Sequence, residues 1–332
     1  MKKTDVTLLI ADETPLSNIT YFAGVPLTHV ALCITKEGKK LYISPLDAGK
    51  KFNIPSQILV TPLLNILKPL KPKTFGIDFE QTSVRRMGKL KGTFPRAKFI
   101  DVGPELENKR KIKRQDELDI LSEAARIANR AYTKMLSTFD YKTEADVKAF
   151  LEYEMAKHGA APAFPTIVAS GYHAATPHHT TQNVKLNKGL CVIDFGANYK
   201  GYCSDCTRTI AIGTPTTEQK KVYSIVRKAQ EAALYRVKPG VKCSVLDAVT
   251  RKSLGLWNKH FIHSLGHGIG LDVHELPNVS AKSKDILQKN MVITIEPGAY
   301  QSPIGVRIED TVVVQDKPKV LTNLTKELVV VK

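Results

Sequence analysis

Apolar and polar positions follow different patterns in the two parts of this chain. Up to about residue 108, short apolar runs are separated by Pro, Gly and short helical stretches, an order that predicts an α/β domain. Beyond it, longer stretches with helical spacing precede β-branched runs. We therefore predict a smaller domain over residues 1–108 and a larger one over residues 109–332. The strands expected in the first domain are Val6–Ile10, Val30–Thr35, Lys40–Ile43, Phe75–Asp78 and Lys98–Asp101.

The second domain is expected to contain two pairs of helices. Each pair is followed by β-branched runs, so the order helix, helix, hairpin occurs twice and indicates an internal pseudo-repeat. The spacing of apolar residues and the capping signals place these helices. They are Gln115 to about Ser137, Thr143 to Gly159, Thr217 to Pro239-Gly240, and one capped by Ser244 that carries Val245, Ala248 and Val249.

Each expected hairpin carries two carboxylates in apolar surroundings. Asp194 and Asp205 belong to the first hairpin, and Glu296 and Glu309 belong to the second. Opposed residues of an antiparallel pair lie side by side on one face, so we expect each hairpin to bring its two carboxylates together. Neither turn has the favoured two-residue sequence, which leaves longer loops open. The turns that give this register are Tyr199–Lys200 and Ser302–Pro303.

Four carboxylates in apolar strands require compensation. Neighbouring carboxylates repel each other, and burying one without a partner is costly. His267, in a Gly-rich segment between the hairpins, adds an imidazole. Together these groups provide enough ligands for two divalent ions, and their chemistry suits Mn, Co, Zn or Fe(II). The alternative is that the carboxylates form structural ion pairs with Arg208 and Arg307.

Several stretches, in order over the second domain, resemble the pita-bread metallopeptidases, and most of all their Xaa-Pro branch of prolidase and aminopeptidase P. They are Ser170-Gly171 to His179, Val192–Gly196, Ser204–Thr209, His263–Gly270, His274-Glu275, Ile293–Gly298 and Gly305–Thr311. The resemblance implies an α+β fold, with a C-terminal pita-bread (creatinase/aminopeptidase-like) domain of two pseudo-two-fold halves. The smaller α/β domain before it is expected to be creatinase/prolidase-like, because Asn18–Gly24 resembles a segment of that domain.

The same resemblance implies a set of metal ligands. Asp205 and Glu309 would bridge two ions, Asp194 would complete one site, and His267 and Glu296 would complete the other. The family has lost these ligands in its metal-free members, whereas this chain has all five.

Catalytic and substrate-binding roles follow in the same way. The resemblance implies that His178 and His274 form hydrogen bonds to the scissile carbonyl or to the tetrahedral intermediate. We expect Glu296 to take a proton from the attacking water in addition to binding metal. His179 is expected to be structural. Arg307, two residues before Glu309 in the same strand, is expected to orient carboxylates or to bind the substrate.

The predicted function is therefore hydrolysis of the Xaa-Pro bond by a metallo-exopeptidase, in dipeptides above all. Its substrate would be a small peptide with proline second, and its cofactor two divalent ions per subunit, with Mn or Co favoured. The nearest alternative is an aminopeptidase P that trims longer peptides. More distant candidates are a metal-free creatinase-like hydrolase and a binding protein without catalysis. The resemblance also implies a homodimer.

Composition changes this picture little. The chain is 42% hydrophobic and 24% charged, as in globular proteins, and it has no apolar stretch long enough to cross a membrane. No signal peptide is evident and five cysteines are sparse, which predicts a cytoplasmic protein with reduced thiols. The net charge of +17 admits nucleic acid as a partner, but the lysines are scattered and no nucleic-acid motif stands out. We interpret the densest basic run, Lys109–Arg114, as a solvated linker or the start of a helix.

Overall fold

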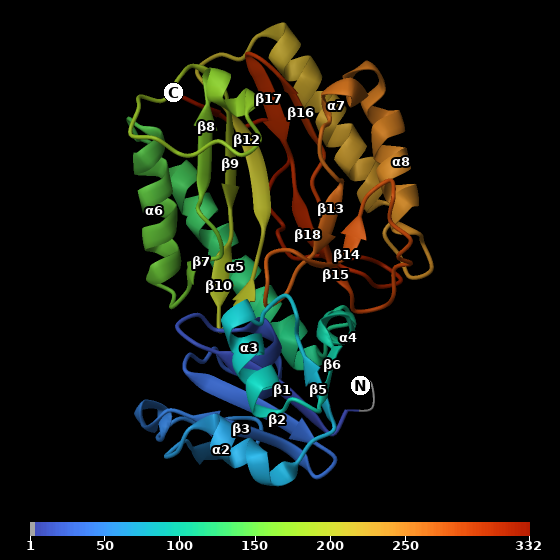
Figure 1. The fold of residues 1–332 in the computed structure, drawn as a ribbon. Coiled ribbons are helices and arrows are strands. Elements are labelled where there is room, and N and C mark those ends of the chain that lie inside the picture. Colours follow the sequence, from blue (N-terminus) through green and yellow to red (C-terminus); the bar gives the residue numbers. More distant parts are fainter. Residues whose placement is uncertain (1–3) are drawn as a thin grey trace. The chain divides into compact units, whose positions relative to one another are not determined.

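A computed structural model of the chain describes residues 4–332 (Figure 1). It divides into two compact units, of which the first ends at Arg110 and the second spans Lys111–Lys332. None of the helices among the described residues is both long and apolar enough to cross a membrane.

The first unit is built on a six-stranded mixed sheet in the order β4-β3-β2-β1-β5-β6. Apolar clusters lie on both faces of the sheet, as alternating strands between helices require. The sequence anticipated every strand except β4, whose three residues are all exposed. The strands are β1 (Val6–Ala11), β2 (Val30–Thr35), β3 (Gly38–Ile43), β4 (Ser56–Ile58), β5 (Thr74–Ile77) and β6 (Lys98–Asp101); the α-helices are α1 (Ser17–Ala23), α2 (Leu63–Leu67), α3 (Val84–Thr93) and α4 (Gly103–Arg110).

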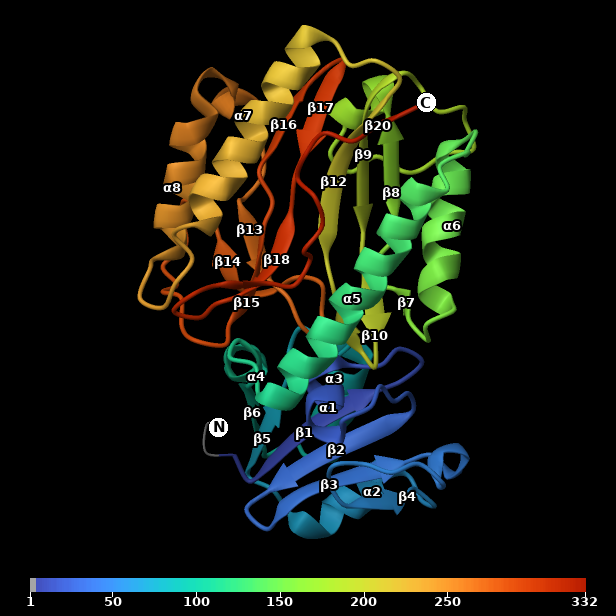
Figure 2. The ribbon, with the colours of Figure 1, turned by 180° about the vertical axis from the view of Figure 1, so that it is seen from behind.

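The second unit has two halves of similar construction. In the first half, helices α5 (Gln115–Ser137) and α6 (Glu144–Ala156) pack against a sheet in the order β20-β12-β9-β8 (Figure 2). In the second half, helices α7 (Thr217–Leu234) and α8 (Cys243–Leu254) pack against a sheet in the order β14-β13-β15-β18-β19. Two smaller sheets, β11-β10-β7 and β16-β17, extend the two hairpins. The strands are β7 (Ala161–Pro162), β8 (Ile167–Ser170), β9 (Gly189–Phe195), β10 (Ala197–Tyr199), β11 (Tyr202–Cys203), β12 (Cys206–Ile212), β13 (Gly266–Gly268), β14 (Glu275–Val279), β15 (Val292–Ile295), β16 (Gly298–Gln301), β17 (Ile304–Arg307), β18 (Asp310–Val313), β19 (Lys319–Val320) and β20 (Val330–Val331).

The helices confirm most of the spacing argument and correct it at α7, which ends at Leu234 and not at Pro239-Gly240, and at α8. Helix α5 has the predicted bounds, and Thr143 caps α6 by accepting a hydrogen bond from the Asp146 amide at 3.0 Å. Helix α8 begins at Cys243, so the prediction that Ser244 caps it is wrong. The helix carries Val245, Ala248 and Val249 as expected, but the side chains that it buries include Leu246 and Asp247, and the Asp247 carboxylate pairs with Arg251 at 2.6 Å.

The first hairpin has a different register from the predicted one. Tyr199 pairs with Tyr202 across a turn at Lys200-Gly201, both of which have positive φ. Asp194 therefore pairs with Thr207 and not with Asp205. The shift is two residues, so it preserves the face on which each side chain lies, and Asp194 and Asp205 remain diagonal neighbours.

The second hairpin has the predicted register. Ile295 pairs with Asp310 and Gly298 pairs with Arg307, as a turn at Ser302–Pro303 requires. Glu296 and Glu309 lie between these pairs, where both strands are interrupted. The interruptions divide the hairpin into β15–β18 and β16–β17, and they leave the two carboxylates facing the same cavity.

Candidate functional site

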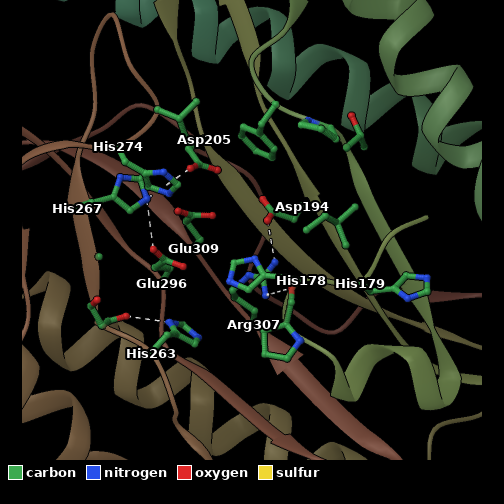
Figure 3. A pocket seen from close by; sticks show the side chains of 18 of the residues that line it. His178, His179, Asp194, Asp205, His263, His267, His274, Glu296, Arg307 and Glu309 are labelled. Carbon is green, nitrogen blue, oxygen red and sulfur yellow. Dashed lines mark hydrogen bonds and ion pairs between the residues drawn. The ribbon is translucent and has the colours of Figure 1, made fainter. Parts of the chain in front are cut away.

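The two halves direct their acidic side chains into one cavity of about 770 Å³ (Figure 3). Asp205, His267 and Glu309 each offer a ligand atom within 4.8 Å of the other two. His267 Nε2 lies 3.4 Å from Glu296 Oε1 and 3.7 Å from Asp205 Oδ2. Asp194 lines the same cavity, so the structure brings together all five side chains that the sequence singled out as ligands.

Two glycines allow the strand with His267 to enter this site. A Cβ atom on Gly266 would lie 2.1 Å from the carbonyl oxygen of Thr294, and one on Gly268 would lie 2.2 Å from that of Leu276. Both contacts are with backbone, which cannot move without breaking the sheet. Strand β13 therefore fits between β14 and β15 only if glycine stands on either side of His267.

Arg307 is held by a dense set of contacts beside Asp194. Its guanidinium donates hydrogen bonds to Asp194 Oδ2 at 2.7 Å, the Tyr300 hydroxyl at 3.0 Å, Thr207 Oγ1 at 3.1 Å and the Pro177 carbonyl at 3.2 Å. The side chain is buried. The sequence admits two roles for Arg307, orienting carboxylates or binding substrate, and these contacts favour the first.

The acidic groups at the centre lack enough compensating charge. Burial, followed by the proximity of Glu309 and Asp194, raises the pKa of Asp205 well above its usual range. Burial, followed by the charges of Glu296 and Asp194, raises the pKa of Glu309 to about 8. Asp194 Oδ1 and Glu309 Oε1 are buried and have no hydrogen-bond partner among residues 4–332. A divalent cation would supply both the missing charge and the missing contacts.

His267 and Glu296 form a contrasting pair at one edge of the cluster. Burial disfavours the charged forms of both, but their mutual contact outweighs it. The contact raises the pKa of His267 to about 8 and lowers that of Glu296 below its usual value. Glu296 therefore stays ionised more readily than Asp205 and Glu309, whose pKa values are raised. Carboxylate oxygens with one imidazole are a donor set that Mn, Co, Zn and Fe(II) accept, so the residues present fit a metal centre.

Comparison with known proteins identifies the larger unit. A profile described as metallopeptidase family M24 matches residues 119–316, and one described as the creatinase/prolidase N-terminal domain matches residues 2–112. This chain is a member of metallopeptidase family M24. The match agrees with the predicted fold, a creatinase-type α/β domain followed by a pita-bread domain, and with the prediction of a metallo-exopeptidase.

Named relatives and solved structures cover nearly all of this M24 chain. The Xaa-Pro dipeptidase of Pyrococcus horikoshii is 37% identical over 99% of this chain and 96% of its own. The crystal structure of the X-Pro aminopeptidase from Thermotoga maritima matches with a TM-score of 0.92 at 34% identity, covering 99% of this chain and 98% of that one. The prolidase structure from Pyrococcus horikoshii matches with a TM-score of 0.91 at 37% identity, over 98% and 96% of the two chains.

His178 and His274, which the resemblance assigned to the substrate, both line the cavity of this M24 centre. The ring of His274 packs edge-on against that of His267, with 4.4 Å between the centroids. Burial lowers the pKa of His274, which keeps its imidazole neutral near pH 7 and able to donate one hydrogen bond.

His179 belongs to a second acid–histidine group. Glu144 contacts His173 Nδ1 at 2.8 Å and His179 Nε2 at 2.9 Å, one through each carboxylate oxygen. The two rings are stacked, 4.3 Å apart and 21° from parallel, so their in-plane lone pairs cannot both point at one ion. Ser170 also donates its amide to Glu144 at 2.8 Å. Glu144 therefore anchors both ends of the segment from Ser170 to His179, which carries His178.

Sequence reasoning missed His263 and Tyr300. His263 Nε2 lies 3.0 Å from the Tyr300 hydroxyl, which in turn accepts a hydrogen bond from Arg307. His263 lines the cavity beside Glu296. The available signal was its position four residues before His267 in a segment already singled out.

Proposed function

We propose that this M24 peptidase hydrolyses the Xaa-Pro bond of dipeptides with two divalent metal ions. The ligands would be Asp194, Asp205, His267, Glu296 and Glu309. The observation that supports this most strongly is the convergence of these five groups on one cavity, with buried carboxylate oxygens that lack partners among the described residues. The names of the relatives, Xaa-Pro dipeptidase and prolidase, support a substrate with proline second.

The roles of the chain's own residues follow from their surroundings. Two divalent ions bound here would lower the pKa of the attacking water and polarise the peptide carbonyl. Glu296, ionised beside His267, accepts the proton of the attacking water and passes it to the leaving proline nitrogen. Arg307 fixes the orientation of Asp194 through the 2.7 Å contact.

His178 and His274 serve the carbonyl oxygen. Both line the cavity, and a neutral imidazole can donate a hydrogen bond to an oxygen that becomes negative in the transition state. Removing one such donor typically costs ~3 kcal/mol of barrier. The oxygen-rich donor set with a single imidazole fits Mn, Co, Zn or Fe(II), and among these we propose Mn or Co.

Chelation tests this proposal. Protein stripped with a chelator should lose hydrolysis of Ala-Pro and regain it when Mn or Co is added back. Ala-Ala serves as the matched dipeptide without proline, and it should remain a poor substrate throughout. Activity on Ala-Pro that is indifferent to thorough metal removal would refute the proposal and favour a metal-free, creatinase-like chemistry.

An Xaa-Pro aminopeptidase is the second candidate, because a similar structure carries the name X-Pro aminopeptidase. It would remove the first residue from longer peptides with proline second. The comparison of kcat/KM for Ala-Pro and Ala-Pro-Ala separates the two. Dipeptidase activity predicts a clear preference for Ala-Pro, whereas equal or better cleavage of the tripeptide would favour the aminopeptidase.

A further inference from the structure

The cavity continues from the five expected metal ligands to helix α6. Its lining there includes Lys148 of α6, the segment Phe164–Ile167 and Pro177–Thr181. In Figure 3, His179 marks this end, on the side of Asp194 away from His267. The side chains of Phe164, Pro165 and Ile167 give the wall an apolar surface that suits the ring of a proline.

A dipeptide that binds here brings a carboxylate directly after the scissile bond. Of the described residues that line the cavity, Arg307 and Lys148 carry permanently cationic groups. The guanidinium of Arg307 is buried and already donates to Asp194, Tyr300, Thr207 and Pro177. Turning it toward a substrate would break these contacts and release Asp194. Lys148 is therefore the cation that can accept a new partner.

Lys148 is held only loosely. Its ammonium lies 3.9 Å from Glu152 Oε1, and 34% of its side chain is exposed. An exposed pair of this kind, one helical turn apart, contributes little and breaks easily. The ammonium has three donors and a flexible stem, so it can turn to an incoming carboxylate.

Thr166 provides a second, independent observation. It is only 2% exposed, it lines the cavity, and its hydroxyl has no hydrogen-bond partner within the described part of the chain. A buried hydroxyl without a partner is costly, and an acceptor on a ligand would relieve that cost. The neighbouring hydroxyl of Thr181 is already committed, because it donates to the Thr166 carbonyl at 2.9 Å and accepts from the Val168 amide at 2.8 Å.

We propose that Lys148 and Thr166 form a subsite for the free carboxylate of the substrate's proline. The ammonium supplies the charge and the threonine hydroxyl supplies a donor, while the apolar wall receives the ring. The enzyme then selects peptides that end at this proline, which makes Lys148 a specificity-determining residue. This inference rests on the proposed Xaa-Pro activity and adds the basis of its preference for dipeptides.

The test compares Ala-Pro with its C-terminal amide, which has the same shape without the charge. Metal-loaded wild type should hydrolyse the acid at least about tenfold better in kcat/KM, as expected for a charge-assisted contact. Lys148→Met should bring this ratio close to one, mainly by raising KM for the acid. Lys148→Arg should keep most of the preference. Thr166→Val should lower it severalfold.

Lys157→Met is the matched control. Lys157 follows the end of the same helix, pairs with Glu154 at 3.5 Å and does not line the cavity. This variant should keep the wild-type ratio. Melting temperatures and metal content of all the variants show whether each remains folded and loaded.

The outcomes separate this inference from the proposed function. An active wild type together with an unchanged acid-to-amide ratio in Lys148→Met would overturn the subsite and leave the Xaa-Pro activity standing. Equal losses on both substrates in Lys148→Met would also overturn it, since the loss would not depend on the carboxylate. A metal-loaded wild type that cleaves neither substrate would overturn the proposed function, and the subsite with it.

Discussion

Glu309 and Asp310 are consecutive buried carboxylates with opposite surroundings. Asp310 contacts Arg208 at 2.6 Å, Lys326 at 2.8 Å and the amide of Gln230 at 2.8 Å. Burial alone would raise the pKa of Asp310, but the charges of Arg208 and Lys326 outweigh it and hold that pKa below its usual value. This cluster supplies its own cations and is complete as folded.

Glu309 has no such compensation. Thr207 donates to its Oε2 at 2.8 Å, and its Oε1 has no partner anywhere in residues 4–332. Burial of a carboxylate therefore does not by itself indicate a metal. The sequence left open that the four hairpin carboxylates form ion pairs with Arg208 and Arg307. Asp194 does pair with Arg307, at 2.7 Å, whereas Arg208 pairs with Asp310, which is not one of the four. Ion pairs do not account for Asp205 and Glu309, where the protein leaves negative charge unbalanced.

The largest expected effect comes from removing the carboxylate of Glu309, whose charge is not compensated by a neighbouring cation. Glu309→Gln should lower kcat/KM on Ala-Pro by about 10³-fold or more, because metal contributes several kcal/mol to the barrier. The same variant should bind less Mn by elemental analysis. Asp119→Asn, an exposed carboxylate on α5, is the control and should be unaffected. Full activity in Glu309→Gln would show that the cluster around Glu309 is not the metal centre.

Substitutions in the cluster around Asp310 should lower the stability of the protein and leave its metal content unchanged. Arg208→Met removes the buried partner of Asp310 and leaves its charge less compensated. Breaking a buried ion pair in this way typically lowers the free energy of unfolding by ~3–5 kcal/mol, so the denaturation midpoint should fall sharply. If that variant does not fold, Lys326→Met is the milder substitution, since the lysine is partly exposed. The folded fraction should still bind Mn as wild type does. Loss of metal without loss of stability would contradict the distinction.

The two clusters should also respond to pH in opposite directions. In metal-free protein, Glu309 keeps a proton up to about pH 8 in the folded state but only to about pH 4.5 when unfolded. Its contribution to stability is therefore lost as the pH rises through this window, and that of His267 is lost between about 6.5 and 8. Asp310, with a lowered pKa, contributes stability that is lost as the pH falls below its usual value of 3.8.

Urea denaturation of metal-free protein from about pH 6 to about pH 8 measures this difference. The free energy of unfolding should decrease with pH in wild type, and the decrease should be smaller in Glu309→Gln. Saturating Mn should abolish it. A free energy of unfolding that rises over this range in the metal-free protein would contradict the assigned charge imbalance.

The smallest expected effects come from two matched threonines. Thr207 bonds to Glu309, and Thr322 bonds to Asp310 at 3.1 Å. Thr207→Val should weaken Mn affinity by about 10-fold, as the loss of a partner behind a metal ligand commonly does. Thr322→Val should leave Mn affinity unchanged and lower stability by about 1 kcal/mol. Titration calorimetry and denaturation of both variants check the pair, and equal effects on Mn affinity would contradict the comparison.

The sequence predicted elements best where one physical rule dominated. Apolar spacing over 23 residues placed both ends of α5. A turn centred on Ser302–Pro303 gave the correct register of the second hairpin. The register of the first hairpin was wrong by two residues. Its turn is Lys200-Gly201, where Lys200 has a positive φ, and turn preferences such as that for Asn-Gly do not indicate this conformation for a lysine. The cap of α8 was wrong because the helix begins at Cys243 after Lys242, which makes no side-chain capping hydrogen bond that a sequence pattern could reveal.

The candidate site shows the same division. The five expected ligands stand in recognisable motifs, and all five line one cavity. Lys148 and Thr166 stand in no motif, and their relation to the cavity arises only when α6 packs beside β8. Long-range packing, and not local pattern, decides which residues surround a substrate.

The most direct test of the metal centre is anomalous X-ray diffraction from crystals grown with Mn. We predict two Mn ions in each chain, enclosed by Asp194, Asp205, His267, Glu296 and Glu309, with Asp310 bound to Arg208 and free of metal. The absence of Mn density among these five side chains at saturating Mn would contradict it.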